Sequence, residues 1–185
     1  VPDASEREQR CAEAMQRLTT TASALRADGY DIRIVTSGGT GTALFCGQHT
    51  GVTEVQPGSF VFMDTSYRRV LGAAYEHALV VLSTVLSRPR AGEAVIDAGL
   101  KSLSTDMGCA EPAALPGVSY RPAGDEHGIL SWDAAALDPA LTVGDRVALW
   151  PSHIDTTINL HDEYHVHRGG SYEGVWPVSA RGRVQ

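Results

Sequence analysis

The chain has 185 residues, of which 43% are hydrophobic and 20% charged, a composition typical of a globular protein with one sizeable domain or parts of two. The net charge of -7 argues against a nucleic-acid partner. No apolar run reaches membrane-spanning length, and the first residues carry no signal-peptide core. Three widely spaced cysteines make no disulfide framework. We therefore expect a cytoplasmic protein that binds neither nucleic acid nor membrane.

The first 35 residues predict a helix followed by a strand. Ser5 and Glu8 fit a capping box, apolar residues recur at helical spacing up to Leu25, and Gly29 supplies a C-terminal stop. Residues 31–35 then predict a short buried strand. A helix, a glycine and then a strand is the order of elements typical of a βα-barrel. The alternative is a free-standing helical hairpin.

A glycine-rich stretch, T-S-G-G-T-G-T at residues 36–42, follows that strand directly. Glycines let backbone amides approach an anion, and the hydroxyls of Ser37, Thr40 and Thr42 add neutral donors. In a barrel, active sites are built at this end of the strands. The T-S-G-G-T-G-T stretch therefore predicts an anion-binding loop, with a plain turn as the alternative.

Residues 53–64 predict a second strand–loop unit.

From about residue 76 the pattern becomes β. Strands are predicted at residues 78–87, bounded by R-P, at residues 94–98, and in G-V-S-Y and G-I-L-S-W. Residues 164–168 and 171–176, around Gly169-Gly170, predict a hairpin. No clear helix is predicted in this part of the chain.

The run R-V-A-L-W-P predicts a strand that ends at Pro151, since proline cannot donate to a ladder. His153 and Asp155 follow, two residues apart, which in extended backbone places both side chains on one face. An imidazole and a carboxylate there could hold Zn, Mn or Mg. The alternative is a loop histidine paired with a neighbouring aspartate. A site of three histidines, His161, His165 and His167, is less favoured than a solvated histidine face on the hairpin.

The run P-S-H-I-D-T-T-I-N-L-H-D resembles the metal-binding segment of the D-threonine aldolase and D-serine dehydratase family. These are pyridoxal phosphate enzymes on the alanine-racemase-like scaffold. S-G-G-T-G-T, D-A-G-L-K-S-L-S-T-D-M-G and E-H-G resemble further segments of the family. The resemblance implies an α+β fold: the C-terminal part of a TIM-type βα-barrel, residues 1–75, followed by an all-β D-serine dehydratase-like domain, residues 76–185.

The resemblance also implies the site residues. The metal ligands would be His153 and Asp155. Dehydratases of the family typically carry H-x-C and bind zinc, whereas the aldolases carry H-x-D, and a carboxylate suits Mn or Mg better than a thiolate would. The cofactor-binding residues would be Ser37, Gly38, Gly39, Thr40, Gln56, Gly58, Ser59 and Tyr67. Gln56 stands where alanine racemases have an arginine, so the cofactor would be a modest electron sink. Tyr67 could equally be a core residue.

The chain contains a single lysine, Lys101, although a pyridoxal phosphate enzyme needs a Schiff-base lysine. Lys101 falls in the β-domain, and the family's lysine lies upstream of anything seen here. We therefore expect a C-terminal portion without its catalytic lysine. Asp97 and Asp106 are expected to cap turns, while His127 could be a turn or a site residue.

The function implied is retro-aldol cleavage of D-β-hydroxy-amino acids to glycine and an aldehyde. The alternatives are dehydratase-like elimination, or a non-catalytic metal-binding β-domain. The expected partners are a small D-amino acid and either a second copy, forming a homodimer, or the missing N-terminal segment.

Overall fold

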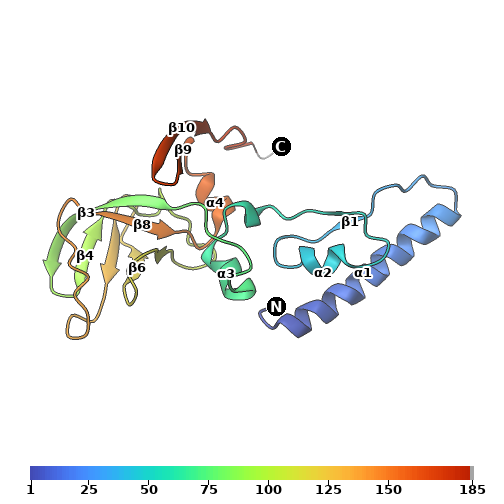
Figure 1. Ribbon diagram of the computed structural model, residues 1–185, viewed down its shortest axis with the longest axis horizontal. Helices are drawn as coiled ribbons and strands as arrows, with labels where there is room; N and C mark the ends of the chain where they lie inside the picture. The colour runs from blue at the N-terminus through green and yellow to red at the C-terminus, as the bar shows by residue number, and fades with distance from the viewer. Residues whose placement is uncertain (184–185) are drawn as a thin grey trace. The chain divides into compact units, whose positions relative to one another are not determined.

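The computed structural model describes residues 1–183. The chain forms two compact units (Figure 1). Unit 1 comprises residues 1–63 and 67–76, and unit 2 comprises residues 64–66 and the chain from His77 onward. The glycine-rich loop belongs to unit 1, whereas His153 and Asp155 belong to unit 2.

Unit 1 begins with helix α1 (Ala4–Ala27). Its N-cap is Asp3, whose carboxylate accepts a hydrogen bond from the Glu6 amide at 2.8 Å, so the predicted capping box at Ser5 is wrong by two residues. Either residue type can cap a helix, but Ser5 lies within α1, whereas Asp3 directly precedes its first residue. The predicted stop is confirmed, because Gly29 adopts a φ of +91° directly after the C-cap Asp28.

The β-structure of unit 1 is shorter than predicted. Residues 31–35 form no strand; instead β1 (Thr36–Ser37) pairs in parallel with β2 (Glu54–Val55). Val35 is buried and its amide donates to Thr53 Oγ1 at 2.9 Å, but Ile34 is exposed. The rest of the unit contains α2 (Ala43–Gly47), the 3₁₀ helix η1 (Ser59–Val61) and most of α3 (Thr65–Leu71).

The small core of unit 1 joins α1 to α2. Cys11 and Met15 of α1 and Cys46 of α2 are its buried members. The sulfur atoms of Cys11 and Cys46 lie 2.8 Å apart as free thiols. Burial, and then the hydrogen bond with Cys46, raise the pKa of Cys11 to about 12. The helix that follows the glycine-rich loop is thus packed firmly against α1.

Unit 2 is built on a six-stranded antiparallel sheet in the order β5-β8-β3-β4-β7-β6. It curls into a nearly closed barrel whose end strands approach each other. Its buried side chains include Val85, Ile96, Leu130 and Leu149, which fill the interior because alternate positions along each strand point inward. The strands are β3 (Val81–Arg90), β4 (Glu93–Ile96), β5 (Glu111–Pro112), β6 (Ser119–Pro122), β7 (Gly128–Ser131) and β8 (Arg146–Trp150).

Two predicted features of unit 2 are wrong. Strand β3 does not end at Arg88-Pro89 but continues to Arg90, and Pro89 lies where the β3–β4 register shifts between Ser87 and Arg90. A proline needs no ladder donor at such an irregularity. In addition, a short helix, α4 (Ile154–Ile158), interrupts the otherwise all-β part.

The predicted hairpin is confirmed. It consists of β9 (Glu163–Arg168) and β10 (Ser171–Pro177), joined at Gly169 and Gly170, which both have positive φ. In Figure 1 it follows α4 in the chain and lies outside the six-stranded sheet.

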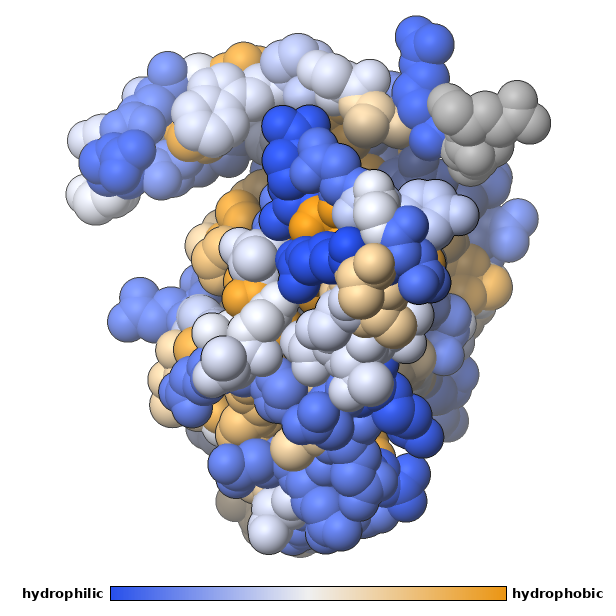
Figure 2. All heavy atoms as spheres, turned by 90° about the vertical axis from the view of Figure 1, so that its right-hand side faces the viewer, coloured by the Kyte–Doolittle hydropathy of each residue, from blue (hydrophilic) through white to orange (hydrophobic). Residues whose placement is uncertain are grey.

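The surface shown in Figure 2 mixes hydrophilic side chains with small patches of apolar ones. Among the helices of residues 1–183, none has the length and apolar character that a membrane span requires.

Candidate functional site

The segment after β8 brings His153 and Asp155 together. The strand ends at Trp150 as predicted. His153 is the N-cap of α4, with an extended φ of −140°, and Asp155 lies in the first turn of that helix. The extended backbone predicted for both residues is therefore wrong for Asp155. Even so, His153 Nε2 and Asp155 Oδ2 lie 3.3 Å apart.

This separation fits two ligands of a single cation. Nitrogen and oxygen ligands each lie about 2.0–2.2 Å from a divalent metal, so two of them at right to tetrahedral angles are roughly 3.0–3.4 Å apart. The His153 side chain is 27% exposed and that of Asp155 is 60% exposed, so solvent and small molecules can reach the position between them. The arrangement can hold a cation and leave other coordination positions open.

A third residue, Asp106, contacts the opposite nitrogen of the imidazole. Asp106 Oδ2 lies 2.5 Å from His153 Nδ1, while Asp106 Oδ1 accepts hydrogen bonds from Ser104 Oγ at 2.6 Å and Thr156 Oγ1 at 3.0 Å. The hydrogen bond from Ser104, followed by those from His153 and Thr156, outweighs partial burial and lowers the Asp106 pKa to about 2.

The sequence predicts that Asp106 caps a turn, and its contact with Ser104, two residues away, fits that prediction. The contact with His153 spans 47 residues of sequence. A spacing of that length carries no local pattern, so Asp106 was missed as a member of the site.

The other candidates of unit 2 do not join this group. His161 Nε2 lies 2.9 Å from the Ser102 carbonyl oxygen. His165 and His167 are both exposed along β9, and their rings lie 6.3 and 5.3 Å from the Tyr172 ring, as expected for a solvated histidine face. Within residues 1–183, no three His, Cys, Asp or Glu side chains are arranged to hold a metal ion.

The remaining predicted residues have structural partners. Lys101 Nζ forms an exposed ion pair with Glu126 at 2.5 Å, and the His127 carbonyl accepts from the Ala123 amide. Asp97 spans two strands rather than a turn, since its Oδ1 accepts from Ser83 Oγ and the Thr84 amide, both at 2.7 Å.

In unit 1, the two predicted cofactor segments converge. Because β1 and β2 are parallel neighbours, the loops after them lie side by side. The backbone amide of Gln56 donates to the Gly38 carbonyl at 2.9 Å, and the backbone amide of Phe60 donates to Thr40 Oγ1 at 3.2 Å. The Tyr67 ring also packs here, for a Cβ placed on Gly41 would lie 3.3 Å from Tyr67 Cε1.

The backbone of these loops leaves donors and space for an anion. The amides of Gly39, Thr40 and Gly41 donate no hydrogen bond within residues 1–183. A Cβ placed on Gly39 or Gly58 would meet no atom within 4 Å. Backbone amides without a partner beside open space are the kind of donors that bind an anion, so these loops are compatible with a bound phosphate group.

Gly38 is required for a different reason. Its φ is +88°, and a Cβ there would lie 2.9 Å from Cys46 Cβ. The glycine therefore serves close packing of the loop on α2.

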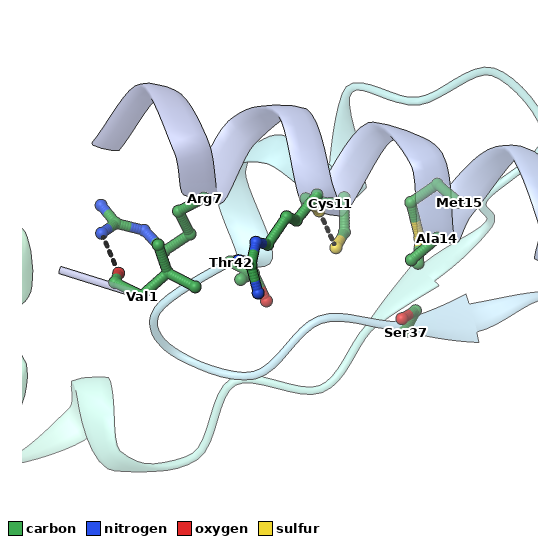
Figure 3. Close-up of a pocket in the computed structure, with 9 residues that line it drawn as sticks. Val1, Arg7, Cys11, Ala14, Met15, Ser37 and Thr42 are labelled. Atoms are coloured by element: carbon green, nitrogen blue, oxygen red, sulfur yellow. Dashed lines mark hydrogen bonds between the residues drawn. The ribbon is translucent and has the colours of Figure 1, made fainter. Parts of the chain in front are cut away.

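A pocket of about 320 Å³ lies between the loop and α1. Figure 3 shows Ser37 and Thr42 on one side of it, with Cys11 and Met15 of α1 opposite. Arg7 also lines it, and its guanidinium donates to the Val1 carbonyl at 2.9 Å. Of the predicted cofactor residues, all within residues 1–183, Ser37 alone lines this pocket.

Known proteins resemble both units. The "Putative serine dehydratase domain" model matches residues 78–167. D-threonine aldolase of Arthrobacter sp. is 40% identical over 186 residues, covering 96% of this chain and 47% of that protein. The crystal structure of D-threonine aldolase from Filomicrobium marinum has a TM-score of 0.93 and 40% identity, covering 100% of this chain and 51% of that one.

A dehydratase is also similar. D-threo-3-hydroxyaspartate dehydratase from Delftia sp. HT23 has a TM-score of 0.76 and 30% identity, covering 92% of this chain and 51% of that one. A variant of a D-threo-3-hydroxyaspartate dehydratase has been solved in a metal-free form.

The two units and their β-barrel thus define the C-terminal part of an alanine racemase-like fold, which confirms the predicted fold class. Both the aldolase and the dehydratase branches match over nearly the whole chain. The chain carries a putative serine dehydratase domain at residues 78–167 and is similar over nearly its whole length to the C-terminal part of D-threonine aldolases. It spans about half the length of the curated relatives it matches.

Proposed function

We propose that the protein containing this chain is a metal-dependent pyridoxal phosphate lyase that cleaves D-β-hydroxy-amino acids to glycine and an aldehyde. The observation that carries the proposal is the His153–Asp155 pair, with its ligand atoms 3.3 Å apart. The 40% identity to a D-threonine aldolase supports it.

His153 Nε2 and an Asp155 oxygen would hold the cation. When bound, a divalent cation supplies Lewis acidity that makes a coordinated hydroxyl proton easier to remove. Because Asp155 offers a hard oxygen rather than a thiolate, the pair favours Mn or Mg, with Zn a third possibility. The exposure of both side chains leaves room for the β-hydroxyl of a small D-amino acid.

The converging loops of unit 1 would hold the phosphate of the cofactor. Pyridoxal phosphate, when bound, supplies an electron sink for the electron pair released from the substrate. The residues we assign to its binding are Ser37, Gly38, Gly39, Thr40, Gln56, Gly58, Ser59 and Tyr67. Gln56 carries a neutral amide, which forms no ion pair with the ring nitrogen. The Schiff-base lysine is assigned outside this chain, because Lys101, the single lysine here, lies in the β-domain and not in the barrel part that carries this lysine in the family it resembles.

Gly39 tests the phosphate loop without disturbing the fold. In Gly39→Ala the new methyl group has open space within the protein but would occupy the concavity meant for the ligand. Overpacking a filled site costs about 1–3 kcal/mol, so we expect pyridoxal phosphate affinity to fall by about tenfold with thermal stability unchanged. Absorbance titration of the cofactor-free full-length protein would measure it.

Gly47→Ala provides the matched control. Gly47 lies in α2 of the same unit, and a Cβ there would make an ordinary contact of 3.5 Å with Val55 Cγ1. This variant should bind the cofactor as the parent does. Equal affinity in Gly39→Ala and the parent would contradict the assignment of this loop.

Elimination of the hydroxyl, as in a dehydratase, is the second candidate, favoured by the similarity to D-threo-3-hydroxyaspartate dehydratase. We also propose a cytoplasmic protein, supported by three free cysteines in residues 1–183. A homodimer is proposed from the family resemblance alone.

Metal-depleted full-length protein, supplied again with Mn²⁺ and pyridoxal phosphate, should release acetaldehyde and glycine from D-threonine. The metal-depleted sample should be nearly inactive. Ammonia from D-serine, without aldehyde from D-threonine, would instead establish the dehydratase. No product from either substrate would support a non-catalytic metal-binding domain.

A further inference from the structure

We propose that Asp106 is a positioning residue for the metal site: its carboxylate fixes the tautomer and orientation of His153 so that Nε2 faces the cation. The inference rests on the proposed function, because it concerns the same His153–Asp155 pair. It adds a residue that lies 47 positions earlier in the chain.

The two imidazole nitrogens have different partners. Nδ1 lies 2.5 Å from Asp106 Oδ2, and Nε2 lies 3.3 Å from Asp155 Oδ2. The lone pairs of the two nitrogens point away from each other, so Asp106 cannot ligate an ion held at Nε2. A carboxylate at Nδ1 instead accepts a hydrogen bond from Nδ1–H and so keeps the ring proton on that nitrogen, which leaves the Nε2 lone pair for the metal.

Asp106 is itself held in place. Its other oxygen, Oδ1, accepts hydrogen bonds from the hydroxyls of Ser104 and Thr156. Thr156 lies in α4, one residue after the proposed ligand Asp155. The carboxylate therefore has Oδ1 committed to hydroxyls and Oδ2 directed at the imidazole, an arrangement that leaves it little rotational freedom.

The loop that carries Asp106 is also fastened to the segment that carries the ligands. The Ser104 amide donates to Thr157 Oγ1 at 3.2 Å, and Ser152 Oγ donates to the Ser104 carbonyl at 3.2 Å. Ser152 and Thr157 are fully buried. These contacts flank His153 on both sides in sequence, so loop and ligand segment form one structural unit in which Asp106 orients the ring.

Mn²⁺ binding to the full-length protein, counted by the electron paramagnetic resonance signal of free Mn²⁺, tests the inference. Asp106→Ala should weaken Mn²⁺ binding by about 10- to 100-fold, the usual effect of losing such an outer partner. Asp106→Asn should weaken it less, because its amide oxygen can still accept from Nδ1–H. Replacing Mn²⁺ by Co²⁺ should give Asp106→Ala an altered visible spectrum, which a purely structural role would not produce.

Glu126→Gln is the control, since it removes one exposed carboxylate from the same unit, and it should bind Mn²⁺ like the parent. Affinity within twofold of the parent in both Asp106 variants would overturn the inference while leaving the metal pair intact. A parent protein that binds neither Mn²⁺ nor Co²⁺ would overturn the metal pair and the inference together. Should Asp106→Ala fail to fold, Asp106→Leu, which is close to aspartate in size and cannot accept from Nδ1–H, decides by the same two readouts.

Discussion

Replacing His153 by alanine is expected to remove Mn²⁺ binding and, with it, the cleavage of D-threonine by the full-length protein. The substitution deletes one of two proposed ligands and leaves Asp155, on an exposed helix turn, as the other. Loss of a ligand should exceed the loss of an outer partner, so we expect activity at limiting Mn²⁺ to fall by more than about 100-fold. Initial rates measured across a Mn²⁺ titration would show it.

His165→Ala is the matched control for that experiment. His165 is also an exposed histidine beside a carboxylate, with its Nε2 3.4 Å from Glu163 Oε1, but it lies on β9 and belongs to the solvated face. Its removal should leave the Mn²⁺ titration unchanged. A normal titration in His153→Ala, or an equal loss in both variants, would contradict the assigned ligand.

The features that could be predicted from the sequence are those set by a few adjacent residues. Gly29 ends α1, Pro151 follows the end of β8, and Gly169-Gly170 turns the β9–β10 hairpin. In each case the backbone conformation is dictated by glycine's freedom at positive φ or by proline's missing amide. Such constraints act locally, so tertiary packing had little scope to override them.

The features that were missed depend on partners distant in the chain. Five residues of α4 are too few to show a helical period, and its N-terminus is held by Asp64, 90 residues away. Strand β3 runs through Pro89 because the ladder to β4 is irregular there. The contact between Asp106 and His153 has the same origin: two loops that meet only once the barrel has formed.

The candidate cofactor loop could be predicted from the sequence only in part. Its glycines and hydroxyls are enough to suggest anion binding from the sequence alone, and the family resemblance supplies the partner segment at Gln56–Ser59. The sequence does not show which of these glycines is needed for close packing and which leaves space for a ligand. The structure separates Gly38, which packs on Cys46, from Gly39 and Gly58, which face open space.

Replacing Asp64 by alanine is expected to destabilise unit 2 and weaken metal binding together. Asp64 is 0% exposed, and its Oδ2 accepts the Ile154 amide at 3.1 Å, at the first residue of α4. Removing the carboxylate would leave that buried amide unpaired, which costs about 1–3 kcal/mol. The same change frees the helix start that fixes His153. Urea denaturation and Mn²⁺ titration of the one variant would measure both effects.

Asp133→Ala is the control, because it shows how much stability and Mn²⁺ affinity change when an aspartate is lost from an exposed turn of the same unit. Asp133 Oδ1 accepts the Ala135 amide at 2.9 Å, but in an exposed turn, where water can replace it, so a change below about 0.5 kcal/mol is expected. The neighbouring residues make Asp64 different, because the Thr65 amide donates to the Pro151 carbonyl at 3.0 Å and both residues are buried. The segment at Asp64 and Thr65 and the segment from Pro151 to Ile154 are thus joined by a backbone hydrogen bond as well as by the Asp64 side chain. If Asp64→Ala lost stability but bound Mn²⁺ normally, the backbone contact alone would suffice to position His153; if it lost neither, α4 would not depend on this cap.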